Sequence, residues 1–148
     1  MKNHDFYKQA ASIMSEGRHR HAPGEYQHSP ANLRRIMADI DIRGNNGLDG
    51  YDVSHVQLLA KVYEKGPVAV KLIAAGLGWD QEKVIEHIED MEESNFLKYD
   101  GAICEVSEEG AVVLKMVADK MLEEDRFWLK QRLDLIEEIL ESASSSSV

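Results

Sequence analysis

Apolar residues recur along most of the chain at the three- and four-residue spacing of amphipathic helices. This pattern predicts six helical segments, at about residues 5–14, 30–39, 52–65, 69–75, 80–94 and 107–141. The last segment continues for about thirty residues, either as one rod or as two helices broken near residues 123–125. A Ser-rich stretch follows it, and this composition predicts a disordered tail.

Local signals define the ends of the central helices. Asp52 and Asp80 stand where N-capping side chains belong, and Ser107 can cap the last helix. Gly66 followed by Pro67 ends the third helix, because glycine adopts a left-handed conformation readily and proline cannot continue a helix.

Residues 96–106 alternate apolar and polar side chains, with Asp100 and Gly101 in the middle. An Asp-Gly pair between alternating segments is a strong hairpin signal, because glycine supplies the positive φ of a tight turn. Asn95 is suited to a left-handed helix stop just before it. The sequence therefore predicts one β-hairpin directly after the fifth helix.

The order helix, short helix, glycine turn, helix and hairpin is typical of a winged helix-turn-helix domain. We therefore predict a chain that is mainly α with a small β-hairpin, with N-terminal helices before the winged helix and a long helix after it. The alternative is a generic helical bundle that carries one hairpin. Leu72 and Ile73 of the short helix should be buried. The predicted segments are N-terminal helices with a basic arm, the winged helix, a dimerisation helix and the tail, at residues 1–46, 47–110, 111–141 and 142–148.

Several short motifs carry a family resemblance. They are Ser29-Pro30, Leu33-Arg34-Arg35, Gly47-Leu48-Asp49, Gly66-Pro67-Val68, Leu72–Leu77, Val84-Ile85-Glu86 and Phe96-Leu97. On these motifs the chain from Leu33 to Gly101 resembles the C-terminal winged-helix domain of RuvB, the Holliday-junction branch-migration motor. The resemblance implies a module from DNA transactions.

Four features depart from that family. The nucleotide-binding motif G-x-x-x-x-G-K-[ST] does not occur in the 148 residues. Ala31 stands where the family has a nucleotide-sensing arginine after Ser/Thr-Pro, and the segment from Ile85 to Phe96 is shorter. The predicted wing is poor in arginine, since Lys98 and Asp100 are its only charges near the turn. The resemblance therefore implies the module without its motor.

The net charge of −10 is unevenly distributed. Residues 1–50 carry seven Lys or Arg and six Asp or Glu, about +1, whereas residues 51–148 carry ten and 21, about −11. DNA binding normally requires several phosphate contacts from Lys or Arg. We expect any such contact to use the first half of the chain or a local patch.

The candidate nucleic-acid-binding residues are cations of the N-terminal region and of the wing side. They are Arg18, Arg20, Arg34, Arg35, Arg43, Lys71 and Lys98. The alternative is an ordinary solvated loop and helix surface. The predicted third helix of the winged helix is acidic, so it is a poor reader of the major groove. We therefore predict a module of recombination, replication or transcription that contacts DNA through the N-terminal arginines and the wing and not through this helix. The alternative is that the chain is an acidic adaptor or DNA mimic that binds a DNA-processing protein.

No cluster of residues predicts catalysis, a metal or a cofactor. His19, His21 and His28 lack a known zinc-ligand spacing, and thiolates are absent near them. His55 and His87 lie on separate predicted helices and are expected to be surface or packing residues. We therefore predict a binding module and not an enzyme.

The long C-terminal helix carries the clearest interaction signal. Its apolar stripe predicts a homodimer interface of Leu114, Val117, Met121, Trp128, Leu129, Leu133, Ile136 and Leu140. The alternative is that this helix folds back on the N-terminal helix and completes the core of one chain.

Composition also indicates a compartment. The single cysteine, Cys104, cannot form an internal disulfide, and residues 1–5 lead into no apolar signal core. No apolar run is long enough to span a membrane. We expect a cytoplasmic protein.

Overall fold

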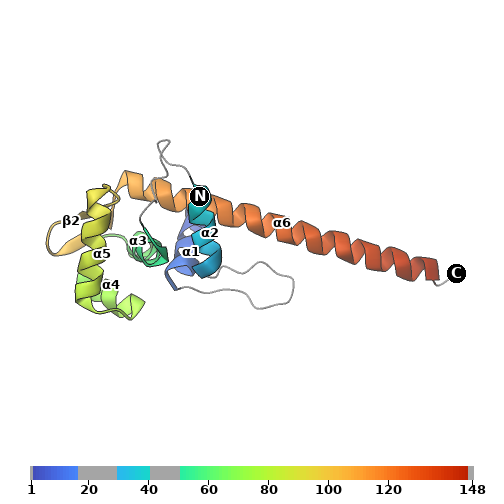
Figure 1. Ribbon diagram of the computed structural model, residues 1–148, viewed down its shortest axis with the longest axis horizontal. Coiled ribbons are helices and arrows are strands. Elements are labelled where there is room, and N and C mark those ends of the chain that lie inside the picture. Colours follow the sequence, from blue (N-terminus) through green and yellow to red (C-terminus); the bar gives the residue numbers. More distant parts are fainter. Residues whose placement is uncertain (1, 17–29, 41–50, 147–148) are drawn as a thin grey trace.

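The computed structural model describes residues 2–16, 30–40 and 51–146 as a helical body from which one long helix projects (Figure 1). The helices are α1 (Lys2–Glu16), α2 (Pro30–Asp39), α3 (Val53–Lys65), α4 (Val70–Leu77), α5 (Gln81–Glu93) and α6 (Glu108–Ser146). The strands are β1 (Val68–Ala69), β2 (Leu97–Tyr99) and β3 (Ile103–Val106). The predicted fold class is confirmed: helices α3, α4 and α5 followed by the β2–β3 hairpin form a winged helix-turn-helix.

The sheet has one strand more than the sequence predicted. Its order is β1-β3-β2 with antiparallel neighbours, and Val68 pairs with Cys104 on β3. The segment around Val68 has no alternating run of its own, because it is only two residues long and lies between two helices. Its pairing with β3 holds the start of α4 against the wing.

The hairpin turn lies one residue later than the Asp-Gly pair alone suggests. Tyr99 pairs with Cys104, so Gly101 and Ala102 form the tip. Gly101 has a φ of 94°, which explains the glycine. Asp100 stays at the base, and its Oδ1 accepts hydrogen bonds from the backbone N–H groups of Ala102 and Ile103 at 2.8 Å. Asn95, as predicted, has a left-handed φ of 62°.

Helix α3 is the centre of the core. Val56, Leu58, Leu59, Ala60 and Val62 are fully buried on it. Helices α1, α2, α4, α5 and α6 all contact α3, so its apolar residues are covered on nearly every side. The N-terminal helices therefore share one core with the winged helix.

Capping explains where two helices begin. The carboxylate of Asp52 accepts the His55 N–H, and the His55 ring accepts the Asp52 N–H, which completes a reciprocal capping box at α3. Ser107 Oγ accepts the Gly110 N–H at 3.0 Å and so caps α6. The predicted capping role of Asp80 is wrong, because its side chain makes no capping hydrogen bond although it occupies the N-cap position of α5.

Leu72 also differs from its prediction. Ile73 is fully buried on α4, but Leu72 is 60% exposed, because the helix turns that position away from α3 and α5. A helix as short as α4 buries only a narrow stripe, and here Val70, Ile73 and Ala74 fill it.

Helix α6 is one continuous rod, which decides between the two predicted alternatives. It spans 39 residues, roughly 58 Å at 1.5 Å per residue. Its first half packs against α1, α2 and α3, while its second half projects away from the body (Figure 1). The helix also includes Ser142–Ser146, where the Ser-rich composition predicted disorder. No helix among the described residues is both long and apolar enough to cross a bilayer.

The predicted dimer interface needs correction at three positions. Leu114, Val117 and Met121 are at most 3% exposed and lie in the core of the chain itself. They face α1, α2 and α3, so they cannot also form a surface for a second copy. Leu129, Leu133, Ile136 and Leu140 are exposed on the projecting half. The side chain of Trp128 lies outside the described residues.

Candidate functional site

The outward face of α5, the third helix of the winged helix, is acidic. Val84, Ile88 and Met91 are fully buried against the core, which fixes the opposite face in solvent. The exposed carboxylates of α5 are Glu82, Glu86, Glu89, Asp90, Glu92 and Glu93. Lys83 is the one cation of this helix, and its Nζ lies 4.2 Å from the Trp79 ring centroid. At that distance the ammonium group makes a cation–π contact with the ring, so Lys83 has a partner beside the acidic face.

The wing adds little positive charge to this face. Lys98 on β2 lies opposite Glu105 on β3, so a cation and an anion form a cross-strand pair. At the turn, hydrogen bonds from the backbone N–H groups of Ile103 and Ala102 lower the pKa of Asp100, so its carboxylate stays charged. The wing is therefore close to neutral or acidic beside the acidic helix.

The central segment of the chain, which contains α5 and the start of the wing, matches a known domain family. Residues 45–98 match the family model described as RuvB C-terminal winged helix domain. This central segment is a winged helix similar to that domain. The match confirms the resemblance that the short motifs indicate, and it covers 54 of the 148 residues. A search of curated proteins found no match to the chain.

Helices α1, α2 and α6 and strand β3 lie outside the matched segment. The acidic residues of α5 lie within it, so this chain combines a RuvB-like winged helix with a strongly acidic outer helix.

The predicted nucleic-acid-binding cations lie on separate elements. Arg34 and Arg35 are exposed on α2, and Arg35 Nη1 forms an ion pair with Glu124 Oε1 of α6 at 2.7 Å. Lys71 is exposed on α4 and Lys98 on β2. Along the long axis of the molecule, α2 lies beside α6 and is well separated from β2 (Figure 1). The remaining predicted cations, at positions Arg18, Arg20 and Arg43, lie outside the described residues.

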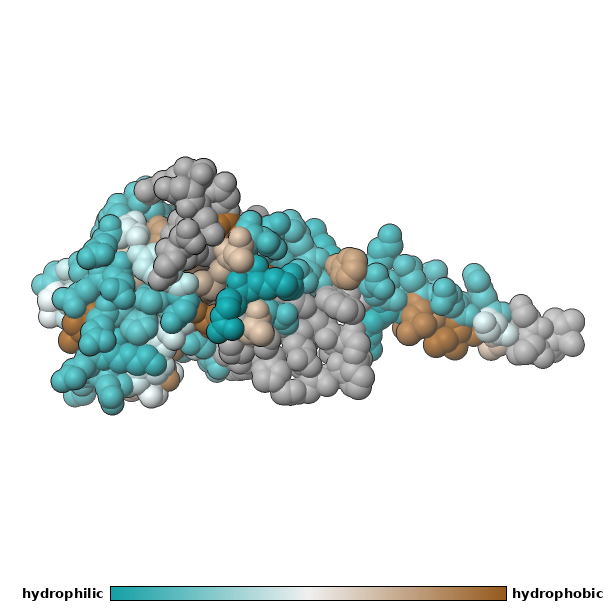
Figure 2. All heavy atoms as spheres, viewed as in Figure 1, coloured by the Kyte–Doolittle hydropathy of each residue, from teal (hydrophilic) through white to brown (hydrophobic). Residues whose placement is uncertain are grey.

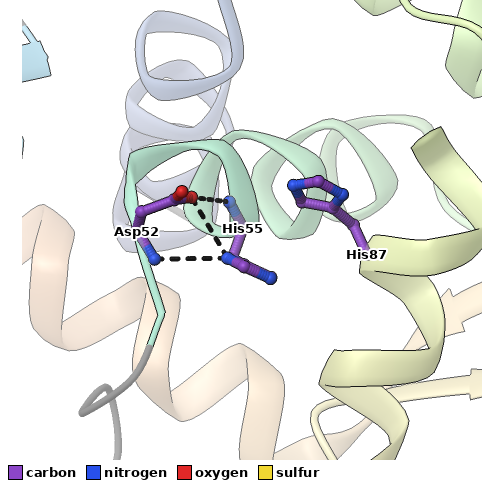
Figure 3. A group of neighbouring side chains, drawn as sticks. All are labelled: Asp52, His55 and His87. Carbon is purple, nitrogen blue, oxygen red and sulfur yellow. Dashed lines mark hydrogen bonds and ion pairs between the residues drawn. The ribbon is translucent and has the colours of Figure 1, made fainter.

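His55 on α3 and His87 on α5, which were predicted to lie on separate helices, meet between these two helices (Figure 3). The ring centroids of His55 and His87 are 4.4 Å apart, and His87 also contacts the Trp79 ring at 5.1 Å. One polar atom each of Asp52, His55 and His87 lies within 4.8 Å of the others. The buried His55 thus lies at the centre of a polar cluster.

The hydrogen bonds of this cluster occupy both nitrogens of His55. Its Nδ1 accepts the Asp52 N–H at 3.2 Å, and its Nε2 lies 3.0 Å from Asp90 Oδ2. The arrangement fits the neutral ring with its proton on Nε2. Nδ1 is also 3.1 Å from Asp52 Oδ1. Both ring nitrogens of His55 therefore have polar partners within the cluster.

Chemically, two imidazoles and a carboxylate are a donor set that Zn²⁺ accepts. In this cluster, however, a metal bound to His55 would have to displace the capping hydrogen bond at Nδ1 or the Asp90 contact at Nε2. The His87 Nδ1 lies 2.9 Å from the Lys83 carbonyl oxygen, which leaves Nε2 as its free lone pair. The observed hydrogen bonds of His55 therefore connect the start of α3 to α5.

Tyr51 strengthens this tie. Its hydroxyl donates to the backbone carbonyl of Asp90 at 2.8 Å and shares a short hydrogen bond with the Ser94 hydroxyl. The signal that could have revealed the cluster is the Asp52–His55 spacing, since an acceptor three residues after the N-cap is the pattern of a capping box. The contact of His55 with α5 has no such local signal.

Proposed function

We propose that the chain is a non-catalytic winged-helix adaptor, whose acidic α5 binds a basic surface on a protein of the DNA-processing machinery. A winged helix of the RuvB C-terminal kind is a non-catalytic, DNA-related module. The observation that supports the adaptor is the outer face of α5, with six exposed carboxylates and one lysine that contacts Trp79. The chain would act by binding, with α5 standing in for a stretch of phosphates.

Electrostatics favours a basic protein partner over a duplex at this face. A carboxylate brought within 4 Å of a phosphate costs about 1 kcal/mol in bulk water and more where water is excluded. Several carboxylates of α5 would meet phosphates at once if the helix entered a major groove. The same charges attract a surface of lysines and arginines and raise the association rate.

A second candidate function is DNA binding away from α5. It is supported by the match to the RuvB winged helix and by Arg34, which is exposed on α2. In this hypothesis phosphates are contacted by cations of the N-terminal region and the wing side, namely Arg18, Arg20, Arg34, Arg35, Arg43, Lys71 and Lys98. Arg35 would then have to exchange its ion pair with Glu124 for a phosphate.

Two binding experiments separate these candidates. In low salt, duplex and four-way-junction DNA should show no binding to the chain if the adaptor hypothesis holds. Binding whose salt dependence weakens after Arg34→Ala and Arg35→Ala would establish the DNA-binding hypothesis instead.

The adaptor requires a positive test as well. A Glu86→Gln, Glu89→Gln and Glu93→Gln variant should lose affinity for a Lys/Arg-rich probe peptide by at least about tenfold, because three attractions are removed. The matched control changes the same number of exposed glutamates on α6, with Glu108→Gln, Glu138→Gln and Glu141→Gln. Equal losses in the two variants would show attraction by net charge alone and contradict a site on α5.

A further inference from the structure

The projecting half of α6 exposes a continuous apolar surface. Figure 2 shows it as apolar side chains gathered along one side of the rod, beyond the body. Its large exposed apolar residues are Phe127, Leu129, Leu133, Leu135, Ile136, Ile139 and Leu140. Each is about half exposed or more, whereas Leu114, Val117 and Met121 earlier in α6 are at most 3% exposed. Apolar patches of this kind on a helix mark an interaction surface.

The centre of this surface has coiled-coil spacing. Leu129, Leu133, Ile136 and Leu140 are separated by four, three and four residues, which is the alternation of d and a positions in a heptad. This spacing reads the same in both directions, with its midpoint between Asp134 and Leu135. The stripe can therefore pair with an identical stripe that runs the opposite way.

The charges along the projecting half of α6 also favour pairing with an identical helix that runs the opposite way. Residues 126–133 carry Arg126, Lys130 and Arg132 and no acid, whereas residues 134–141 carry Asp134, Glu137, Glu138 and Glu141 and no base. Residues 126–133 thus carry +3 and residues 134–141 carry −4, while Glu123, Glu124 and Asp125 before them would lie opposite the uncharged residues 144–146 of an antiparallel copy. An antiparallel partner of the same sequence places each basic half beside an acidic half.

From these observations we propose that residues 123–146 of α6 pair antiparallel with the same segment of a second copy of the chain. About the shared midpoint, Leu129 faces Leu140 of the second copy and Leu133 faces Ile136 of the second copy. Each apolar layer then joins an a position to a d position, as in antiparallel coiled coils. The stripe that one chain leaves in water becomes buried by its own copy.

The extent of the projecting rod agrees with this register. Glu123 faces Ser146 of the second copy, so the paired stretch ends just after Met121, the last buried residue of α6. The whole projecting half is covered, and the paired stretch meets the body only at its start, where Glu124 forms the ion pair with Arg35 of α2. Lys130 and Glu137 of the second copy, both at e positions beside the stripe, then lie close enough to form an ion pair on each side of the two-fold axis.

A parallel pair of the same helices is less favourable. Arg132 could still reach Glu137 of the second copy, so the flanking charges do not decide the orientation. Arg126, however, occupies an a position and would face Arg126 of the second copy, whereas in the antiparallel pair it faces the small Ala143. Residues 51–125 carry 17 Asp or Glu and seven Lys, a net −10, and a parallel pair would place these two acidic bodies side by side.

Sedimentation of the full chain over a range of concentrations tests the pairing. We expect twice the 16.7 kDa mass of one chain. Leu133→Glu with Ile136→Glu should give the single-chain mass at every concentration at which the unaltered chain is a dimer. Both side chains are exposed in the single chain, so the body should keep its helical circular dichroism. The matched control is Leu72→Glu on α4, which is equally exposed and should leave the dimer intact.

Disulfide trapping tests the orientation. When the Leu129→Cys and Leu140→Cys chains are mixed and oxidised, the antiparallel pair should cross-link the two different chains. Either variant alone should stay uncross-linked, because identical positions lie about 16 Å apart along the axis, beyond the reach of a disulfide. Cross-linking of each variant with itself would overturn the antiparallel arrangement. A single-chain mass for the unaltered protein would overturn the pairing itself, whatever α5 binds.

Discussion

His55 Nε2 lies 3.0 Å from Asp90 Oδ2, so the first helix of the winged helix is tied to its outermost helix through a buried ring. The same ring closes the capping box of α3 through Nδ1. One side chain thereby connects the start of the central helix to the acidic face that we propose as the binding surface. The position of α5 depends on this tie as well as on its apolar face.

Replacement of His55 by Ala should lower the free energy of unfolding by about 2 kcal/mol, because the change removes half of a capping box and a buried hydrogen bond. Urea unfolding followed by circular dichroism measures the loss. Gln57→Ala, on the same helix and half-buried, should cost much less. A double-mutant cycle of His55→Ala and Asp90→Ala should give a coupling energy of at least about 0.5 kcal/mol. If the two losses of unfolding free energy simply add, the contact between His55 and Asp90 contributes nothing.

Asp52 should make stability depend on pH in the acidic range. Partial burial alone would raise its pKa, but hydrogen bonds from the His55 and Ser54 N–H groups and the nearby His55 ring lower the pKa overall. Because the pKa is lower in the folded chain, the carboxylate stabilises the fold above its unfolded pKa of about 3.9, and this contribution is lost as pH falls through the folded value.

The measurement is the free energy of unfolding at pH values between about 5 and 3. Asp52→Asn keeps an oxygen that can cap α3 but cannot titrate, so its stability should fall less steeply with acid than that of the unaltered chain. Parallel curves for the two proteins would contradict the role of the Asp52 charge.

Gly110 should not tolerate a side chain. An added Cβ would lie 2.2 Å from the Phe96 carbonyl oxygen, and that backbone also accepts the Ser107 N–H at 3.1 Å. We expect Gly110→Ala to destabilise the fold by about 3 kcal/mol, because the wing and the start of α6 must separate. A thermal melt reports the change.

Gly76 is the matched control for this substitution. The nearest atoms to an added Cβ there belong to the flexible Lys61 side chain, at 3.4 Å. Since Gly76 lies inside α4, Gly76→Ala should be neutral or stabilising by up to about 1 kcal/mol. Equal losses at the two glycines would mean that the contact with Phe96 is not the cause.

Cys104 should be unreactive in the folded protein. Burial on β3, together with the charges of Glu92 and Glu105, raises the pKa of its thiol to about 12, so almost no thiolate exists near neutral pH. A thiol reagent at pH 8 should label the chain slowly in buffer and rapidly in urea. Rapid labelling of the folded chain would show that the wing opens frequently.

The sequence alone determined the elements and their order, because helix spacing, Gly66-Pro67, Asp52 and the alternation around Gly101 are local signals. The predicted helix over residues 30–39 agrees with α2 at both ends, and the motifs indicated the winged helix that the family model matches. Local rules failed where burial depends on neighbours. Leu72 and Ile73 are equally apolar, and only the packing of α4 decides which of them is exposed.

Tertiary structure decided what the long C-terminal stripe does. In sequence its apolar positions form one series, yet Leu114, Val117 and Met121 fill the core of the chain while Leu133 and Ile136 remain in solvent. Periodicity shows which face of a helix is apolar but not what covers that face. The same holds for His55 and Asp90, which are 35 residues apart and meet only because the apolar faces of α3 and α5 pack together.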